Sequence, residues 1–119
     1  MNYSILNSVK KMLGLAEDYT PFDTDIILHI NTVFSILFQM GIGSDTAFSI
    51  TDSTSKWSDF LGDVDTIEMI KSYMYLKVRL LFDPPTTGGV KEAIENSVKE
   101  LEYRIYVSEQ NRKEYKEVT

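Results

Sequence analysis

The stretch YMYLKVRLLFDPP, residues 73–85, decides how this chain folds. It is the densest apolar and aromatic run in the sequence, and a double proline ends it. A proline cannot continue a helix, and it pushes the residue before it out of the α region. The run therefore predicts the C-terminal half of a central helix over residues 64–82. The residues of this run that we expect to define the fold are Tyr73, Leu76, Leu80, Phe82, Pro84 and Pro85.

A second long helix is predicted upstream, over residues 22–40. Its apolar residues recur at helical spacing and form a broad face. Leu28 and Ile36 lie off that face, and a helix that is apolar on more than one side is buried on more than one side. We therefore expect this helix to be central to the domain or to meet another subunit. Leu28 and Ile36 are candidate residues of an oligomer interface.

The N-terminal residues 3–13 predict a short helix. One face carries the apolar residues Ile5, Leu6, Val9, Met12 and Leu13, and Lys10 and Lys11 are expected on the other, polar side. A helix this short is marginal in water on its own, so it must dock on the rest of the chain.

The segment 44–62 is expected to be irregular, because it is rich in serine, threonine and aspartate. Near its end lie Trp57, Phe60 and Leu61, at a spacing that suits one helical turn. We interpret them as core residues beneath a long loop, because buried aromatic side chains usually serve packing. The alternative is that Trp57 binds a partner.

The last predicted helix covers residues 90–107, with an apolar stripe on one side and charged residues on the other. The stripe fades after residue 107, so residues 108–119 are expected to form a flexible tail that is frayed or ordered only by a partner. Tyr115 in this tail is a third candidate interface residue. The whole pattern predicts an all-α fold, a small bundle of about four helices in one domain over residues 1–107.

Composition excludes several classes of protein. The chain of 119 residues has 18 acidic and 12 basic residues and a net charge of −6, which opposes binding to nucleic-acid phosphates. It has no cysteine, so it has neither disulfides nor thiolate metal sites. No apolar run approaches the ~20 residues that cross a bilayer, and no signal peptide is visible, so no membrane association is expected.

No constellation of catalytic residues stands out. His29 is the only histidine, and Asp25 lies one helical turn before it, but no second histidine or cysteine completes a metal or catalytic site. The acidic clusters lie at predicted helix N-termini, where carboxylates are expected for electrostatic reasons. We expect no catalytic residue, no metal site and no cofactor.

The ordered motifs of the chain resemble those of the head–tail connector, or adaptor, family of tailed bacteriophages and prophages. The resemblance covers about residues 3–106. The motifs, in chain order, are TDI at 24–26 with HIN at 29–31, MGIG at 40–43, WSDFLG at 57–62, YMYLKVRLLFDPP at 73–85 and ELEYR at 100–104.

This resemblance implies a structural virion protein and not an enzyme. Members of the family form a ring, commonly twelve-fold, beneath the portal protein at the capsid vertex. The ring extends the DNA channel without binding DNA specifically and docks the stopper or tail-completion protein. The implied location is the head–tail interface of the virion, and the host cytoplasm during assembly.

Two other functions stay open at this stage. The first is a small acidic regulator that binds a host or phage protein through the amphipathic helix at 90–106. The second is an enzyme that uses Asp25 and His29, which the missing partners make the weakest interpretation.

Overall fold

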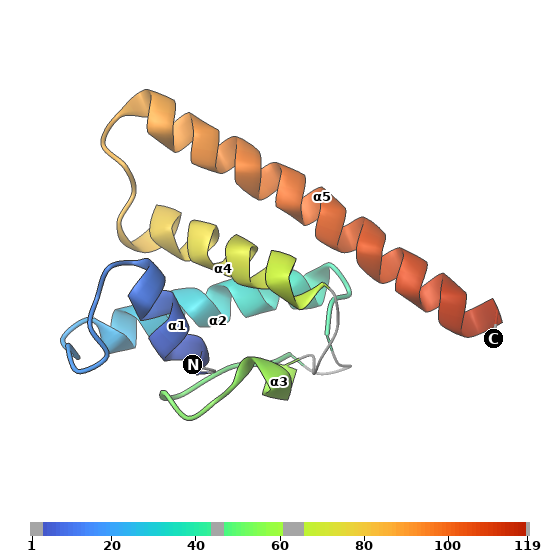
Figure 1. The fold of residues 1–119 in the computed structure, drawn as a ribbon, viewed down its shortest axis with the longest axis horizontal. Helices are drawn as coiled ribbons and strands as arrows, with labels where there is room; N and C mark the ends of the chain where they lie inside the picture. Colours follow the sequence, from blue (N-terminus) through green and yellow to red (C-terminus); the bar gives the residue numbers. More distant parts are fainter. Residues whose placement is uncertain (1–3, 44–46, 61–65, 119) are drawn as a thin grey trace.

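The chain folds as a bundle of helices, described here from a computed structural model (Figure 1). The structure describes residues 4–43, 47–60 and 66–118, and the side chains of these residues up to 111. Within them lie α1 (Ile5–Met12), α2 (Asp23–Gln39), α3 (Trp57–Phe60), α4 (Ile67–Phe82) and α5 (Gly88–Val118). The described residues contain no strand, only an isolated bridge between Ser4 and Lys56. The predicted all-α fold is confirmed.

The core lies between α2 and α4, which run side by side. Ile26, Ile30, Val33, Phe34 and Leu37 are the buried residues of α2. On α4, Ile70, Tyr73, Met74 and Val78 are buried against them. The spacing of three and four residues in both sets is what places each apolar stripe on one helix face.

The stretch at 73–85 ends its helix where the prolines require. α4 stops at Phe82, and Asp83 takes φ −144°, outside the helical region. Tyr73 is fully buried, while Leu76, Leu80 and Phe82 are half-buried and pack on the core from its edge. In the bend that follows, Pro84 is exposed and Pro85 is half-buried.

The short helix α1 begins with Ser4, whose Oγ accepts a hydrogen bond from the Asn7 N–H at 3.2 Å. Ile5, Leu6 and Val9 are buried in the core as predicted, and Leu13 packs on its edge, but Met12 is 57% exposed. The prediction for Lys10 was wrong, because its side chain is only 1% exposed. Its ammonium group lies 2.8 Å from Asp23 Oδ1 and 2.9 Å from the Glu17 carbonyl oxygen, which replace the water it gives up.

The segment at 47–60 is mostly irregular and is held on α2 by Asn31. The Ile50 N–H donates to Asn31 Oδ1 at 2.8 Å, and Asn31 Nδ2–H donates to the Ile50 carbonyl at 2.9 Å. The one-turn helix α3 then buries Trp57 and Phe60, and the Phe60 ring lies 4.7 Å from that of Phe34. Leu61, the third residue expected there, lies outside the described residues.

The last helix is longer than predicted at both ends. α5 begins at Gly88 instead of residue 90, and its backbone stays helical to Val118, through the segment expected to be a flexible tail. No proline or glycine follows Gly89, and residues 109–117 are mostly Glu, Gln, Lys and Arg, which favour helices without any packing. The point at which the apolar stripe fades, after residue 107, therefore does not mark the end of this helix.

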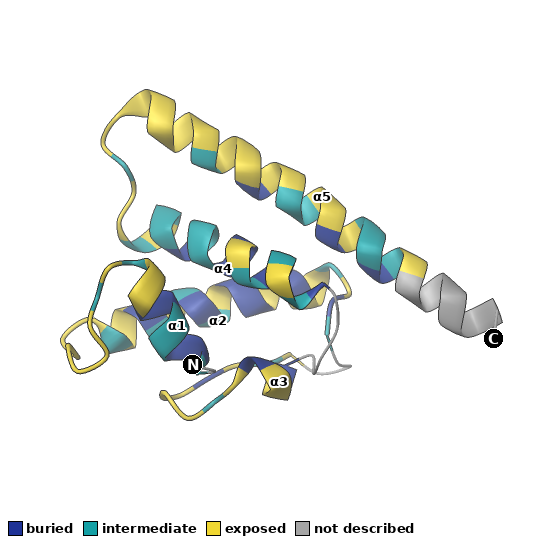
Figure 2. Cartoon of the chain, viewed as in Figure 1, coloured by how far each residue is buried: buried dark blue, intermediate teal, exposed yellow. Residues whose placement is uncertain are grey.

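α5 packs on α4 with one side only (Figure 2). Val98 and Ile105 are buried in that contact, and most of the first half of the helix is exposed. At ~1.5 Å per residue its 31 residues span about 46 Å, which is close to the longest dimension of the molecule, 48 Å. Its C-terminal end projects beyond the other helices (Figure 1).

Candidate interaction surfaces

The Asp25 and His29 side chains do not form a reactive pair. The structure shows neither a hydrogen bond nor an ion pair between them in the part of the chain it describes, and the His29 ring instead lies edge-on to Phe82 at 6.4 Å. The described residues also hold no group of His, Cys, Asp or Glu that would bind a metal ion.

An open groove does lie beside His29, at the end of the molecule where α2 begins and α4 ends. Its volume is about 500 Å³, and its lining residues are Leu13, Leu15, Phe22, Asp25, His29, Phe82 and Asp83. We call it the acidic groove, because Asp25 and Asp83 are exposed and it holds no lysine or arginine. Phe22 is 39% exposed, so part of its ring is available for contact in the groove.

Aromatic rings continue along this groove. The Phe22 ring lies 5.4 Å from Phe82 in an edge-to-face arrangement and 5.8 Å from Tyr19, which is 45% exposed. Such pairs favour one another by about 0.5–1.5 kcal/mol beyond the area they bury. The acidic groove therefore presents an ordered aromatic surface next to carboxylates.

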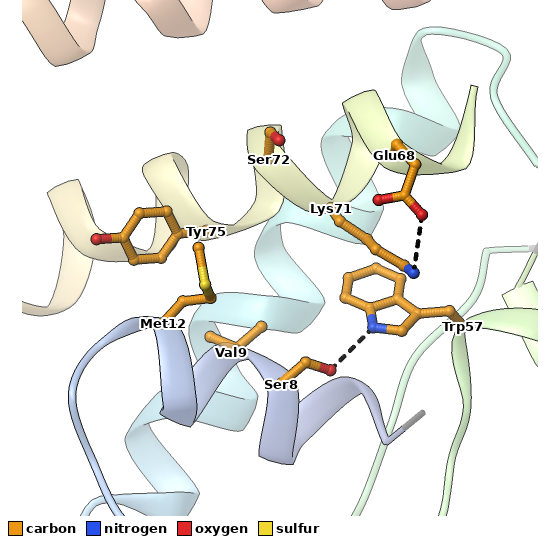
Figure 3. Close-up of a pocket in the computed structure, with 8 residues that line it drawn as sticks. All are labelled: Ser8, Val9, Met12, Trp57, Glu68, Lys71, Ser72 and Tyr75. Carbon is orange, nitrogen blue, oxygen red and sulfur yellow. Dashed lines mark hydrogen bonds and ion pairs between the residues drawn. The ribbon is translucent and has the colours of Figure 1, made fainter. Parts of the chain in front are cut away.

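A smaller pocket of about 240 Å³ lies between α1, α3 and α4 (Figure 3). Trp57 forms one wall, and its Nε1–H donates to Ser8 Oγ at 3.0 Å. The Lys71 ammonium group lies over the indole ring of Trp57, with Nζ 6.0 Å from the ring centroid. The same Nζ forms an ion pair with Glu68 Oε1 at 3.3 Å. The pocket is smaller than the ~300–1,000 Å³ of typical ligand sites, so it suits a single side chain of a partner protein better than a cofactor.

The surroundings of Trp57 agree with both roles that the sequence left open, packing in the core and binding a partner. Its ring is buried and lies 6.4 Å from Phe34 in the core, as expected of a packing residue. Its outer edge also lines the pocket beside Met12, which is exposed. Trp57 can therefore pack in the core and at the same time form one wall of a binding pocket.

The exposed surface of α5 carries aromatic residues. Tyr103 is 69% and Tyr106 47% exposed. Glu100 and Arg104 on the neighbouring face pair with each other at 2.8 Å. Tyr103 and Arg104 also line an open groove against Met69, at the start of α4.

Tyr73 and Glu102 link α4 to α5 electrostatically. Burial raises the pKa of the Tyr73 hydroxyl well above its ordinary value, and the nearby Glu102 carboxylate raises this pKa further. The Tyr73 side chain is fully buried and packs in the hydrophobic core.

The predicted interface residues lie in different environments. Leu28 is 62% exposed on α2, whereas Ile36 is half-buried, so the second apolar face of this helix is narrower than its sequence indicates. The Tyr115 side chain lies outside the described ones. The sequence interpretation missed the acidic groove. A visible signal was the aromatic pair Tyr19 and Phe22, three residues apart at the start of the helix predicted over residues 22–40.

In the described part of the chain, none of the helices combines the length and the apolar character needed to cross a membrane. The exposed surface instead offers apolar and aromatic patches edged by charges, which is the composition of protein–protein contact surfaces.

Comparison with known proteins agrees with this picture. The family model described as phage connector protein matches residues 5–112. No match was found among the curated proteins or the solved structures. Because the family match spans nearly the whole chain, the protein belongs to the phage connector protein family and is a structural component of the phage virion that contacts other virion proteins.

Proposed function

We propose that the protein is the subunit of a head–tail connector ring, commonly twelve-fold in this family, that joins the portal to the stopper or tail-completion protein. The observation that carries the proposal is the family match over residues 5–112. The ring extends the DNA channel. It is assembled in the host cytoplasm and stays at the head–tail interface of the virion.

The surfaces of the subunit support a role in assembly. The acidic groove, the pocket beside Trp57 and the outer side of α5 are three separate surfaces with exposed apolar or aromatic residues. A ring subunit between a portal and a stopper needs contacts to two neighbours of its own kind and to a partner above and below.

The charge of the chain supports free passage of DNA. With 18 acidic and 12 basic residues, the subunit repels phosphate on average. A ring of such subunits surrounds DNA without holding it, which a channel requires.

We also propose that the protein is not an enzyme. This is supported by the surroundings of His29, whose ring lies edge-on to Phe82 and makes no hydrogen bond or ion pair with Asp25 in the part of the chain that the structure describes. Turnover that His29→Ala abolishes in a folded protein would overturn this part of the proposal.

The test is to mix the purified chain with the portal protein of the same phage and to determine masses by native mass spectrometry, followed by electron cryo-microscopy of the complex. We expect a portal complex that carries a ring of this chain, with the symmetry counted directly. A chain that stays monomeric and never binds portal would contradict the proposal. A monomer in isolation would not, because the portal can act as the template for the ring.

The alternative function, a regulator that binds through residues 90–106, is less well supported. The apolar stripe of that segment, including Val98 and Ile105, is buried against α4 of the same chain. Binding by this stripe would require α5 to leave α4 and expose the core.

A further inference from the structure

We propose that the acidic groove binds the guanidinium group of an arginine on a partner protein. The inference deepens the proposed function, because a connector subunit needs a surface for each protein that it joins. It rests on the proposed function only for the identity of that partner, which is the portal or the stopper or tail-completion protein.

The two elements that form the groove each supply one aromatic ring and one carboxylate. Phe22 and Asp25 are three residues apart at the start of α2, so they lie on the same side of the helix. Phe82 ends α4, and Asp83 follows it directly. All four residues line the groove, and both carboxylates are exposed.

The two carboxylates have no counter-charge in their own subunit. Neither Asp25 nor Asp83 forms an ion pair within the part of the chain that the structure describes, and no lysine or arginine lines the groove. Of the basic residues within one helical turn of the lining, Lys10 pairs with Asp23, and Arg79 donates to the Tyr75 hydroxyl at 3.3 Å. Lys11 is exposed outside the lining. A cation that enters the groove therefore meets negative charge that no lining residue neutralises.

The aromatic rings supply a second, independent attraction for an organic cation. The Phe22 and Phe82 rings meet edge-to-face, at an interplanar angle of 71°, and such a contact covers at most one face of one ring. Phe22 is 39% exposed, and Tyr19, whose ring lies 5.8 Å from it, is 45% exposed. A cation over an open ring face is attracted by the ring quadrupole.

This combination selects arginine among the cations of proteins. The guanidinium group is flat, so it stacks on a ring while it donates parallel N–H bonds to a carboxylate. A lysine ammonium is a compact and strongly hydrated charge that gains less from the rings. The groove volume of about 500 Å³ accommodates an arginine side chain, and Leu13 and Leu15 offer apolar surface to its methylene groups.

The arginine is expected on a different protein because of charge. Two copies of this chain carry −6 each and repel one another on average, whereas a basic surface of a partner is attracted. Two of the three arginines of the chain are also engaged in their own subunit, Arg79 with Tyr75 and Arg104 with Glu100. The third, Arg112, lies outside the described side chains.

The first test titrates the full chain with blocked tripeptides that carry arginine, lysine or citrulline between two glycines. NMR follows the imidazole signals of His29, the only histidine, which lines the groove. The arginine tripeptide should bind with a Kd of about 1–10 mM, as suits one exposed side chain. The lysine tripeptide should bind about two- to fivefold more weakly, and the uncharged citrulline tripeptide at least about fivefold more weakly.

Variants of the groove identify the groups that bind the arginine tripeptide. Asp25→Asn and Asp83→Asn should each weaken its binding about two- to fivefold, because each removes one exposed charge. Phe22→Leu should weaken it by a similar factor, because leucine keeps an apolar side chain but has no ring face. The control is Glu95→Gln, which removes one negative charge at an exposed site of α5 and should change the Kd less than about 1.5-fold.

The second test uses the portal and the stopper or tail-completion protein of the same phage. Phenylglyoxal modifies accessible arginines, and mass spectrometry locates those that complex formation protects. The wild-type chain should protect at least one arginine of one of these proteins. The double variant Asp25→Asn with Asp83→Asn should bind that protein about five- to twentyfold more weakly and leave the arginine accessible.

These results separate the inference from the proposed function. If the citrulline tripeptide binds as tightly as the arginine tripeptide, the inference is overturned and the connector role stands. Equal binding of the lysine tripeptide overturns the assignment to arginine. If Arg112→Gln, and no arginine of a partner, removes a contact that depends on Asp25 and Asp83, the occupant is a second copy and the assignment to a partner is overturned. A chain that never binds portal contradicts the connector role, while the tripeptide titration still decides the chemistry of the groove.

Discussion

Asn31 is a polar side chain in the middle of α2 that holds an irregular segment in place. Its amide pairs with both backbone groups of Ile50, which is itself buried. An asparagine suits this position because one side chain supplies a donor and an acceptor in the same plane. The contact fixes where the 47–56 segment meets the core and, through it, where Trp57 lies.

Asn31→Ala should therefore lower the free energy of unfolding by about 2–3 kcal/mol, because it leaves a partly buried N–H and a partly buried carbonyl without partners. Urea denaturation measures the loss, and hydrogen exchange should show the Ile50 amide losing its protection. Thr32→Ala is the control, since Thr32 bonds only within its own exposed helix turn. An unchanged Ile50 exchange rate would show that Asn31 does not anchor the segment.

Lys10 provides a second prediction at the level of single residues. Asp23→Ala removes the carboxylate 2.8 Å from its buried ammonium group. We expect a loss toward the lower end of the ~3–5 kcal/mol seen for broken buried pairs, because Asp23 is 27% exposed and its charge is partly screened by solvent.

The matched control is a double variant that combines Lys10→Met with Asp23→Ala and so removes both charges of the pair. It should be more stable than Asp23→Ala alone, because no unpaired charge remains buried. Thermal denaturation of the three proteins decides this. If the double variant is the less stable one, Lys10 contributes through packing and not through its charge.

At the level of the elements, the joint between α4 and α5 is shorter than the sequence indicates. Gly88 and Gly89 are helical, and a Cβ added to either meets nothing within 4 Å. The bend that aims α5 therefore comprises residues 83–87. Pro84 and Pro85 restrict its backbone, which makes this joint a determinant of the direction in which α5 runs.

Gly88→Ala and Gly89→Ala should each stabilise the protein by about 0.4–1 kcal/mol, because alanine lowers the entropy of the unfolded chain and favours the helix. Gly14→Ala should do the opposite, since Gly14 has φ +83°, a conformation that disfavours a Cβ although the space around it is open. Urea denaturation of the three variants measures the contrast. Destabilisation at position 88 or 89 would mean that these glycines are required in a non-helical state.

The contact of α4 with α5 also gives the protein a defined response to alkaline pH. The pKa of Tyr73 is raised by burial first and by the Glu102 charge second, so the unfolded chain ionises this tyrosine at a lower pH than the folded one. The unfolded state then binds fewer protons, and stability falls as the pH rises above the ordinary tyrosine value of about 10.

Tyr73→Phe should remove this part of the alkaline loss, and Tyr103→Phe, at an exposed site, should leave it unchanged. Denaturation midpoints between about pH 8 and 11 test the difference. Equal slopes for the wild type and Tyr73→Phe would contradict the burial of an un-ionised hydroxyl.

At the scale of the whole molecule, the net charge of −6 predicts weak interaction with polyanions. The chain should not shift duplex DNA in an electrophoretic assay even at low ionic strength, where phosphate binding is strongest. A salt-dependent shift would indicate a basic surface that the average charge conceals. The same absence of retention is expected of the assembled ring, because assembly adds no positive charge.

The sequence by itself determined the class of fold and the main helices. Apolar residues at helical spacing located α1, α2 and α4 to within a few residues, and the prolines located the end of α4, because these signals depend on neighbours along the chain. The motifs around Trp57 and residues 73–85 also indicated the family that the whole-chain match shows.

Only the tertiary structure decided which residues meet from distant parts of the chain. It buried Lys10 beside Asp23, paired Asn31 with Ile50, and assembled the acidic groove from the ends of α2 and α4 and the loop between α1 and α2. Helical periodicity places Lys10 on a polar face. It cannot show that Lys10 is buried beside a carboxylate, because that carboxylate lies 13 positions away in the sequence. Sequence spacing fixes the face on which a side chain lies, but its partner depends on how the helices pack.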